Sequence, residues 1–386
     1  MRYKELGKTG VKVPAVGQGT IGAGRRRDAR PERVKTRLEV LRRGIALGMT
    51  FLDTGEDYED GYAEERLGKA IKGMREKVFI SSKFQPAHNA FPGVMAAIEG
   101  SLKRLGTDYI DLYQVQWPNA AVPVAETMSA LSALVKAGKV RLAGVSNFTP
   151  DQLREAQAAF QPGKLVSVQT EYNLLDRSIE SDLLPYCREN RVTVIAYNLL
   201  SQGHLYFGEK ERDILEKVAE KHGGTVTQVI IAWVISRPPV IALTNTMDLR
   251  HLEQNAAAAD LRLSQADINL IDATFNRQPV LVLPERIRVA SYDADVSHTI
   301  YTTLEETIAN AAGIQPSPTA LAEEIKNGQM LRPVELVRTR DTSGRYDYDL
   351  IHGRVRYWAW VIAHGRQAPI PAFVAGERQY AKSERQ

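Results

Sequence analysis

The sequence predicts an α/β protein: a (β/α)₈ barrel of the TIM-barrel type over residues 1–277, followed by a small α+β domain over residues 278–386. Two observations support this. Eight short apolar, β-branched runs alternate with amphipathic stretches over about 250 residues, which is the length and order of such a barrel. After residue 277 the alternation stops at Pro279 and Pro284, and a new apolar run opens at Val280.

Strands and helices are expected to alternate along most of the barrel. Near-continuous apolar runs indicate strands buried on both faces, at residues 15–20, 50–54, 78–83, 109–116, 140–146, 165–172, 192–197 and 240–244. Amphipathic periodicity indicates helices at residues 33–47, 61–71, 93–105, 124–136, 150–160, 180–191 and 264–275. In the C-terminal domain we expect helices at 304–312, 321–327 and 356–364, strands at 334–338, 348–351 and 370–374, and a polar tail at 376–386.

A doubly wound sheet is the alternative fold. Its first strand would be followed by a glycine-rich dinucleotide fingerprint that opens a helix. Gly17, Gly19 and Gly22 resemble such a fingerprint superficially, but residues 22–33 show no clean helical pattern. The barrel is therefore favoured.

Composition narrows the class of protein. With 386 residues, 44% hydrophobic and 25% charged, the chain is expected to be globular rather than disordered. Its one cysteine, Cys187, excludes an internal disulfide and a cysteine-built zinc site, and no metal site is expected. No long apolar run and no apolar leader occur, so a cytoplasmic protein is expected. A net charge of +4 does not indicate nucleic acid or a membrane as partner.

The carboxyl ends of barrel strands carry the reacting groups of such proteins. These ends hold Asp53 and Lys83, with Tyr58 just beyond the second strand. A nearby ammonium favours the phenolate and should lower the pKa of Tyr58, and an aspartate would hold the lysine in place. Taken singly, each residue has an ordinary alternative: a helix cap, a solvated lysine and a loop aromatic.

A series of segments favours the catalytic interpretation of these residues over the ordinary ones. They are FLDTGEDY (51–58), AEERLG (63–68), ISSK (80–83), LGTDYIDLY (105–113), GKVR (138–141), GVSNF (144–148) and SVQTEYN (167–173). By these segments, residues 1–275 resemble the aldo-keto reductase family. The resemblance implies hydride transfer between a nicotinamide cofactor and a carbonyl or alcohol, with Tyr58 as the acid supported by Lys83 and Asp53.

The resemblance also shows departures from the family pattern. Gln116 stands where the family usually has a catalytic histidine; an amide donates a hydrogen bond but does not titrate. Next to it, Trp117 is expected to contact the substrate. Some relatives, including potassium-channel β subunits, also have an amide at this position and retain slow turnover.

Further residues are implied to hold the cofactor. Ser146, Asn147 and Gln169 match the positions that bind the nicotinamide carboxamide, and Tyr197 matches the aromatic residue on which the ring stacks. The remaining expected contacts are Gly19, Thr20, Asn198, Leu199, Gln202, Asn245, Thr246, Arg250, His251, Gln254 and Asn255. Of the basic residues with which the family binds the 2′-phosphate of NADPH, this segment retains Arg250 and His251. The neighbouring Asp248 would repel that phosphate. NADPH is the expected cofactor, and NADH the alternative.

Residues from about 280 to 375 resemble the amino-terminal module of ParB-like proteins and sulfiredoxin. The segments are LAEEIKNGQMLRPVE (321–335) and YDLIHGRVRYWA (348–359), with Ile370–Pro371–Ala372. Val355 replaces one arginine of the module's phosphate-binding motif, and sulfiredoxin chemistry needs a cysteine that is absent after Cys187. Thirteen basic residues balance thirteen acidic ones after residue 277, so nucleotide or DNA binding is not favoured. We expect an accessory domain with Trp358 and Trp360 as packing anchors.

Two functions follow from these features. The first is an NAD(P)H-dependent carbonyl reductase that acts on a small aldehyde or ketone. The second is a cofactor-sensing, nucleotide-binding or DNA-associated regulator with vestigial turnover, which Gln116 and the weak phosphate grip favour. The substrate and the oligomeric state cannot be read from the sequence, because substrate pockets in barrels are built from variable loops.

Overall fold

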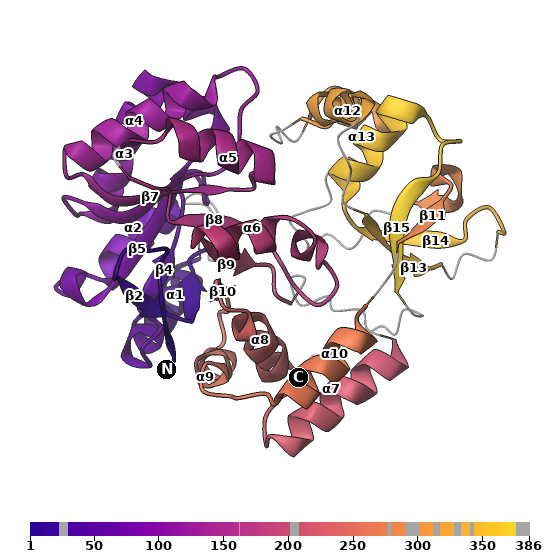
Figure 1. Cartoon of the computed structure of the whole chain (residues 1–386), viewed down its shortest axis with the longest axis horizontal. Coiled ribbons are helices and arrows are strands. Elements are labelled where there is room, and N and C mark those ends of the chain that lie inside the picture. Colours follow the sequence, from indigo (N-terminus) through magenta and orange to yellow (C-terminus); the bar gives the residue numbers. More distant parts are fainter. Residues whose placement is uncertain are drawn as a thin grey trace. The chain divides into compact units, whose positions relative to one another are not determined.

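The chain folds as two compact units (Figure 1). The first comprises Met1–Gly203 and Leu215–Asn269, and the second His204–Ile214 and Leu270–Gln386. The computed structural model describes residues 1–22, 30–161, 163–200, 208–276, 279–289, 301–311, 317–327, 333–339 and 343–375. The expected domain boundary at residues 277 and 278, and the expected tail, lie outside these residues, so the boundary stays a prediction.

A closed parallel barrel forms the first unit, as the sequence predicted. Around the barrel the strands follow one another in chain order, and the last, β10, pairs with the first, β3. They are β3 (Val16–Gly19), β4 (Phe51–Asp53), β5 (Phe79–Phe84), β6 (Ile110–Val115), β7 (Val140–Ser146), β8 (Ser167–Glu171), β9 (Thr193–Tyr197) and β10 (Val240–Thr244). An antiparallel pair that the sequence analysis missed, β1 (Tyr3–Glu5) and β2 (Lys12–Pro14), precedes them.

Helices alternate with these strands along the chain, and Figure 1 shows them on the outside of the strands. They are α1 (Pro31–Ala46), α2 (Tyr62–Ala70), α3 (Phe91–Leu105), α4 (Val124–Lys136), α5 (Pro150–Ala159), α6 (Leu183–Asn190), α8 (Val226–Ser236) and α9 (Leu249–Ala258). Helices α7 (Glu209–Lys221) and α10 (Gln265–Thr274) each run across the division between the two units. Short 3₁₀ turns are η2 (Arg75–Lys77), η3 (Pro86–His88) and η4 (Ser178–Glu180).

Local sequence explains where one of the predicted helices starts. Before α5, the Thr149 side chain accepts a hydrogen bond from the backbone of Gln152, and the Gln152 side chain accepts one from the backbone of Thr149. Pro150 fits the first helical position because its missing N–H would have no partner there. The Thr-Pro signal in the sequence therefore marks the true start of this helix.

The barrel interior is apolar away from the strand ends. Phe51 and Phe79 stack with ring centroids 5.3 Å apart, and Leu112, Ile195 and Ile241 pack around them. This packing requires Gly17, because a Cβ atom at that position would lie 2.8 Å from the carbonyl oxygen of Phe51. Because this part of the barrel interior is filled by apolar side chains, the buried polar side chains gather at the carboxyl ends of the strands.

The second unit is built on a mixed sheet of five strands in the order β11-β15-β13-β14-β12. Its elements are β11 (Val280–Val282), η6 (Pro284–Arg286), β12 (Ile287–Arg288), α11 (Leu304–Ile308), α12 (Pro318–Lys326), β13 (Val334–Arg338), β14 (Tyr348–His352), α13 (Arg354–His364) and β15 (Ile370–Ala375). Trp358 lies in the core and donates a hydrogen bond to the carbonyl of Tyr301 (2.7 Å), while Trp360 is partly buried against that core.

In the part of the chain that the structure describes, no helix is long and apolar enough to cross a membrane.

Candidate active site

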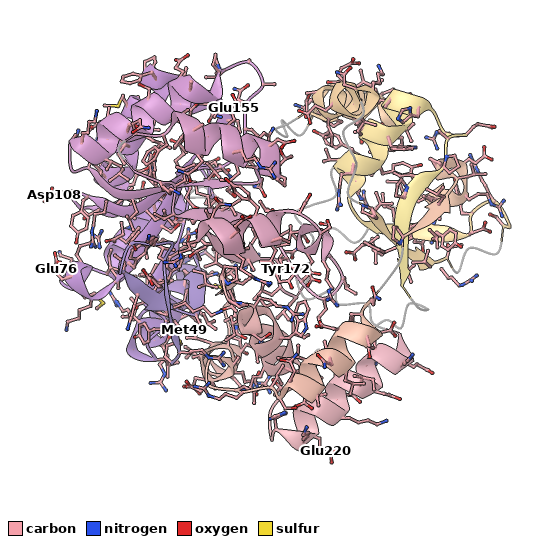
Figure 2. The ribbon with its side chains drawn as sticks, viewed as in Figure 1. Met49, Glu76, Asp108, Glu155, Tyr172 and Glu220 are labelled. Atoms are coloured by element: carbon pink, nitrogen blue, oxygen red, sulfur yellow. The ribbon has the colours of Figure 1, made fainter. Side chains whose placement is uncertain are left out.

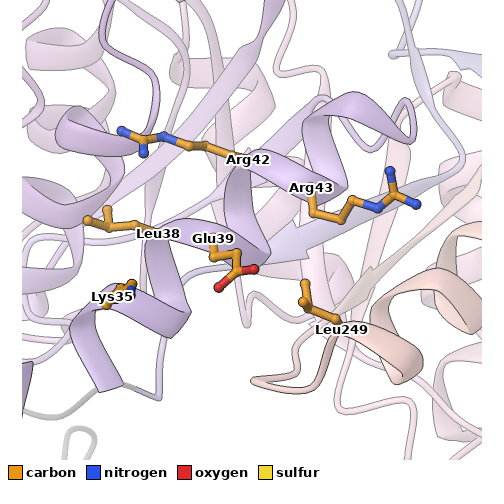
Figure 3. Close-up of a pocket in the computed structure, with 6 residues that line it drawn as sticks. All are labelled: Lys35, Leu38, Glu39, Arg42, Arg43 and Leu249. Carbon is orange, nitrogen blue, oxygen red and sulfur yellow. The ribbon is translucent and has the colours of Figure 1, made fainter. Parts of the chain in front are cut away.

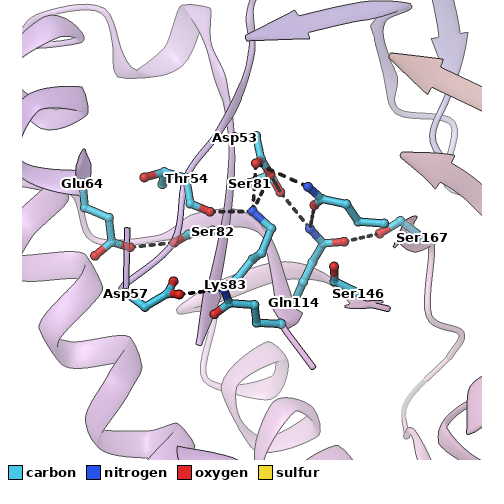
Figure 4. A network of polar contacts seen from close by, with 12 residues as sticks. Asp53, Thr54, Asp57, Glu64, Ser81, Ser82, Lys83, Gln114, Ser146 and Ser167 are labelled. Carbon is cyan, nitrogen blue, oxygen red and sulfur yellow. Dashed lines mark hydrogen bonds and ion pairs between the residues drawn. The ribbon is translucent and has the colours of Figure 1, made fainter. Parts of the chain in front are cut away.

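Lys83 and Asp53 form a buried ion pair at the carboxyl ends of β5 and β4 (Figure 4). The ammonium of Lys83, 1% exposed, donates to both carboxylate oxygens of Asp53 at 2.8 Å and to the carbonyl of Thr54 at 2.7 Å. Burial by itself would lower the pKa of Lys83, but the charges of Asp53 and Tyr58 outweigh it and raise that pKa. Lys83 is therefore a permanent cation, and not a solvated surface lysine.

A chain of amide and hydroxyl groups supports Asp53 from the barrel interior. Its carboxylate accepts hydrogen bonds from Ser81 (3.2 Å) and from the amide of Gln169 (3.4 Å). The amide of Gln114 donates to Ser81 and to Gln169, and its oxygen accepts from Ser167 (Figure 4). Gln114 was missed in the sequence analysis, although a glutamine inside the apolar run IDLYQV is a signal that could have identified it.

Tyr58 lies in the loop after β4, beside this ion pair. The Lys83 ammonium is 4.7 Å from the centroid of its ring. Burial raises the pKa of Tyr58 to about 12, although the nearby positive charge of Lys83 opposes that rise. The sequence analysis expected the lysine to lower this pKa. That expectation has the right sign for the lysine contribution and the wrong sign for the sum, because it left out desolvation of the phenolate.

Gln116 and Trp117 follow β6. The backbone N–H of Gln116 donates to the carbonyl of Phe84, and its side-chain amide donates to the carboxylate of Asp57 at 2.7 Å. The carbonyl of Trp117 accepts from Asn89 (3.0 Å), and its side chain is half-buried. Gln116 is thus bonded to the residue that precedes Tyr58, which places it at the same end of the barrel.

Asn147 connects three strand ends. Its backbone has a φ of 61°, in the left-handed region that asparagine tolerates better than most residues. Its side-chain oxygen accepts from the hydroxyl of Tyr197 (2.8 Å), and its nitrogen donates to Ser146 (3.1 Å) and to the carbonyl of Gln116 (3.0 Å). The structure therefore brings together the expected nicotinamide-binding residues and Gln116.

The residues after β9 are only partly described. Asn198, with a φ of 57°, donates to the carboxylate of Glu171 at 2.5 Å, and Leu199 is buried. Gln202, expected to contact the cofactor, lies outside the described residues.

A buried arginine holds the loop after β10. Arg37 of α1, 1% exposed, donates to the side chain of Asn245 (3.0 Å), the carbonyl of Thr246 (3.1 Å) and the carbonyl of Ile21. Burial, followed by the charges of two neighbouring arginines, lowers its pKa to about 10. The sequence analysis did not select Arg37, because an arginine in an amphipathic helix is usually solvated and nothing in its flanks marks it as buried.

Gly19 and Thr20, at the carboxyl end of β3, lie next to the loop after β10. A Cβ atom at Gly19 would lie 3.5 Å from the side chain of Asn245. Thr20 is buried, and among the described residues its hydroxyl has no hydrogen-bond partner. A buried hydroxyl without a partner is costly, so this oxygen is suited to a bound polar ligand.

The expected phosphate grip lies at the start of α9. Arg250 and His251 are exposed, while Gln254 is half-buried and Asn255 is buried. Asp248 caps the helix, since its carboxylate accepts from the backbone N–H of His251 (3.0 Å). The sequence analysis considered Asp248 only as a repelling charge, whereas its carboxylate also serves as the cap.

A separate groove of about 650 Å³ lies between α1 and the start of α9 (Figure 3). Its lining is of mixed charge: Lys35, Leu38, Glu39, Arg42, Arg43 and Leu249. Arg43 is paired with Glu253 at 2.6 Å. None of these residues belongs to the network of Asp53 and Lys83, and we assign no ligand to this groove.

The residues that form the barrel are similar to known proteins. The model of the aldo/keto reductase family matches residues 15–275. Methylglyoxal reductase YeaE of Escherichia coli (strain K12) is 38% identical over 266 residues, covering 69% of this chain and 92% of that protein. The thermostable aldo-keto reductase Tm1743, solved with the inhibitor epalrestat, is 40% identical with a TM-score of 0.68, covering 71% of this chain and 100% of that one. An aldo/keto reductase of Klebsiella pneumoniae, solved with NADP and acetate, is 36% identical with a TM-score of 0.65, covering 71% and 95%.

Proposed function

The chain belongs to the aldo/keto reductase family, and we propose that it reduces a small aldehyde or ketone with Tyr58 as the proton donor. It is an NADPH-dependent oxidoreductase, as its named relatives are reductases and one was solved with NADP. The buried Lys83–Asp53 pair beside Tyr58 carries the proposal. A fold that only bound a nucleotide would not need a desolvated ion pair next to a phenol.

The described residues fit a nicotinamide cofactor. Asn147, Gln169 and Ser146 offer amide and hydroxyl groups suited to a carboxamide, and the hydroxyl of Thr20 awaits a partner. When bound, NADPH supplies the hydride. We propose Tyr197 for the nicotinamide end and Arg250, His251, Gln254 and Asn255 for the adenosine end. Asn198, Leu199, Asn245 and Thr246 are proposed to lie between these ends.

The protein's own part in the reaction is proton transfer. With a pKa of about 12, Tyr58 is protonated at neutral pH and can donate to the carbonyl oxygen. The phenolate that forms is stabilised by the ammonium of Lys83, which Asp53 holds in place. Gln116 donates a second hydrogen bond to the same oxygen, and Trp117 borders the substrate.

Cofactor binding and carbonyl turnover together test this proposal. Titration with NADPH and NADH, followed by intrinsic fluorescence, should show tighter binding of NADPH. Mixing with a panel of small aldehydes should then oxidise the bound NADPH, and methylglyoxal is the first to test because a relative is named as its reductase. Saturable NADPH binding without oxidation by any carbonyl would contradict a reductase.

That contradicting result would favour the second candidate, a cofactor sensor with vestigial turnover. The observation in its favour is Gln116, whose amide cannot titrate where the family usually has a histidine. For the C-terminal unit, the ParB-like resemblance stays a prediction, and we propose an accessory role without DNA as a partner.

A further inference from the structure

Asp57 is a carboxylate that the proposed mechanism leaves unused. It precedes Tyr58, and its carboxylate accepts a hydrogen bond from the side-chain nitrogen of Gln116 at 2.7 Å. The residue is exposed, and its carboxyl group interacts electrostatically with Lys83 and Tyr58. This geometry places a second carboxylate beside the proton donor.

The bond fixes which end of the Gln116 amide faces Asp57. A carboxylate only accepts hydrogen bonds, so it must face the nitrogen of an amide and not the oxygen. The oxygen of Gln116 is buried, and within the described part of the chain it has no hydrogen-bond partner. Leaving a buried amide oxygen unsatisfied costs free energy. The charge-assisted bond to Asp57 therefore holds the amide in an orientation that its other surroundings do not stabilise.

We propose that Asp57 is a positioning residue: its carboxylate turns the nitrogen of Gln116 toward the Tyr58 side of the site. This leaves the second N–H of Gln116 available to the carbonyl oxygen. The negative charge of Asp57 also disfavours the phenolate of Tyr58 and so helps to keep the proton on Tyr58 until hydride transfer. This inference rests on the proposed function, because it gives Gln116 and Tyr58 their roles in that reaction.

Protonation of Asp57 would reverse both effects. A neutral carboxyl group can donate to the oxygen of Gln116, so the amide can turn over and withdraw its nitrogen. Although Asp57 is exposed as a residue, desolvation of its carboxyl group raises the pKa of Asp57 above its usual 3.8, and the hydrogen bond from Gln116 and the charge of Lys83 oppose that rise. The carboxylate is thus present above this raised pKa, and the positioning is lost as the pH falls through it.

The groups around Asp57 are few. Lys83 of β5, which is paired with Asp53 of β4, acts on Asp57 through its charge but stays protonated at acid pH. Tyr58 belongs to the same loop, and the loop after β6 contributes Gln116, which does not titrate. From η3, the ring of His88 is bonded to Glu56. An acid-side titration of the Gln116 amide is therefore attributable to Asp57.

The test uses the full-length protein and four variants. Asp57→Asn keeps an acceptor oxygen without a charge, Asp57→Ala removes the acceptor, and Asp108→Asn is the matched control. Asp108 is exposed and lies at the outer edge of the barrel unit in Figure 2. Gln116→Leu identifies the side-chain amide resonance of Gln116 in NMR spectra by its disappearance.

The expected results concern the titration of the Gln116 amide resonance and the pH dependence of the rate. In the wild type and in Asp108→Asn, the Gln116 amide resonance shifts with one acid-side pKa, and log kcat/KM for the carbonyl at saturating NADPH falls with a slope of one below it. Asp57→Asn should lose both the shift of the Gln116 resonance and the acid-side fall in kcat/KM. It should also move the alkaline fall in kcat/KM, which Tyr58 governs, to lower pH. Asp57→Ala should lower kcat at pH 7 by about tenfold, the equivalent of one hydrogen bond. Asp57→Asn should not restore it fully, because its amide, like a protonated carboxyl group, can also donate to the oxygen of Gln116.

Contrary results are distinguishable from failure of the proposed function. A Gln116 resonance that does not titrate in the wild type, or titrates equally in Asp57→Asn, overturns the inference whatever the turnover. So does an alkaline limb at the same pH in both proteins. If no carbonyl is reduced but the Gln116 resonance titrates as described, the Asp57–Gln116 coupling stands, whereas its proposed role and the reductase function fall together.

Discussion

Desolvation is the dominant influence on the ionisation of Tyr58. The Lys83 ammonium favours the phenolate, yet burial and the carboxylates of Asp53 and Asp57 favour the phenol, and the pKa of Tyr58 rises to about 12. A pKa raised in this way means that the proton stays on Tyr58 at every pH below that value. At neutral pH Tyr58 is therefore protonated, as the proton donor in the proposed reduction of a carbonyl must be.

Gln116→His should increase turnover. The introduced imidazole would lie near Asp57, and a neighbouring carboxylate raises the pKa of histidine and favours the donating imidazolium. Because a positioned acid contributes about 10²–10⁴-fold, kcat should rise by about tenfold or more. Steady-state rates at saturating NADPH measure this, with Gln116→Leu as the control that should lose activity. A Gln116→His protein slower than the wild type would show that the amide is the adapted group at this position.

At the scale of residues, the rule that reacting groups lie at the carboxyl ends of barrel strands identified most of the buried polar residues at the candidate site. Asp53, Lys83 and Gln169 meet as expected because their types and positions both marked them. Gln114 and Arg37 were missed for different reasons. Gln114 could have been found as a polar residue in an apolar run, whereas burial of Arg37 depends on packing between segments more than 200 residues apart along the chain.

The loop after β10 and the first turn of α9 form the element on which cofactor choice depends. Arg250 is exposed, while buried Arg37 holds Asn245 and Thr246. Arg250→Ala should therefore weaken NADPH by about 1.5 kcal/mol, the low end for a hydrogen bond to a charged group, and leave NADH unchanged. Arg37→Met should weaken both cofactors alike, because it loosens the loop itself.

Fluorescence titrations with both cofactors, at low and high salt, check this pair of changes. Salt should penalise NADPH more than NADH in the wild type, and this difference should vanish in Arg250→Ala. Equal losses for the two cofactors in Arg250→Ala would mean that the side chain supports the loop and does not bind a phosphate.

Most elements with a clear hydrophobic period were predicted, and helix α8, which has none, was not. The strands and six of the helices around them were expected within a few residues of their observed bounds. Helix α8 was missed because all residues from Val229 to Ile235 are buried, so its sequence shows no polar face and no helical period. Helices α7 and α9 were missed although each has an apolar stripe, since no helix was expected between residues 197 and 240 and only residues 264–275 were expected to be helical after the last strand.

At the scale of the whole molecule, the barrel unit is expected to function without the residues that follow it. The compared relatives match this chain over 92–100% of their own length while covering only 69–71% of it. The second unit has its own buried core around Trp358. A chain ending at Asn276 should thus unfold cooperatively and retain kcat within about twofold, because a complete domain carries its own core.

Circular dichroism and turnover of the shortened chain measure this. An insoluble or molten product, with ANS binding and no cooperative transition, would show that residues beyond Asn276 complete the barrel.

The most direct test of the central claim is one turnover with Tyr58→Phe. Premixed protein and NADPH are mixed rapidly with methylglyoxal, or the best substrate of the aldehyde panel, and the loss of NADPH absorbance is followed. The wild type should oxidise its bound NADPH in a single exponential, and Tyr58→Phe should bind NADPH equally well but react at least about 10²-fold more slowly, since only the proton donor is gone. Oxidation by Tyr58→Phe at the wild-type rate would place the proton elsewhere and contradict the account.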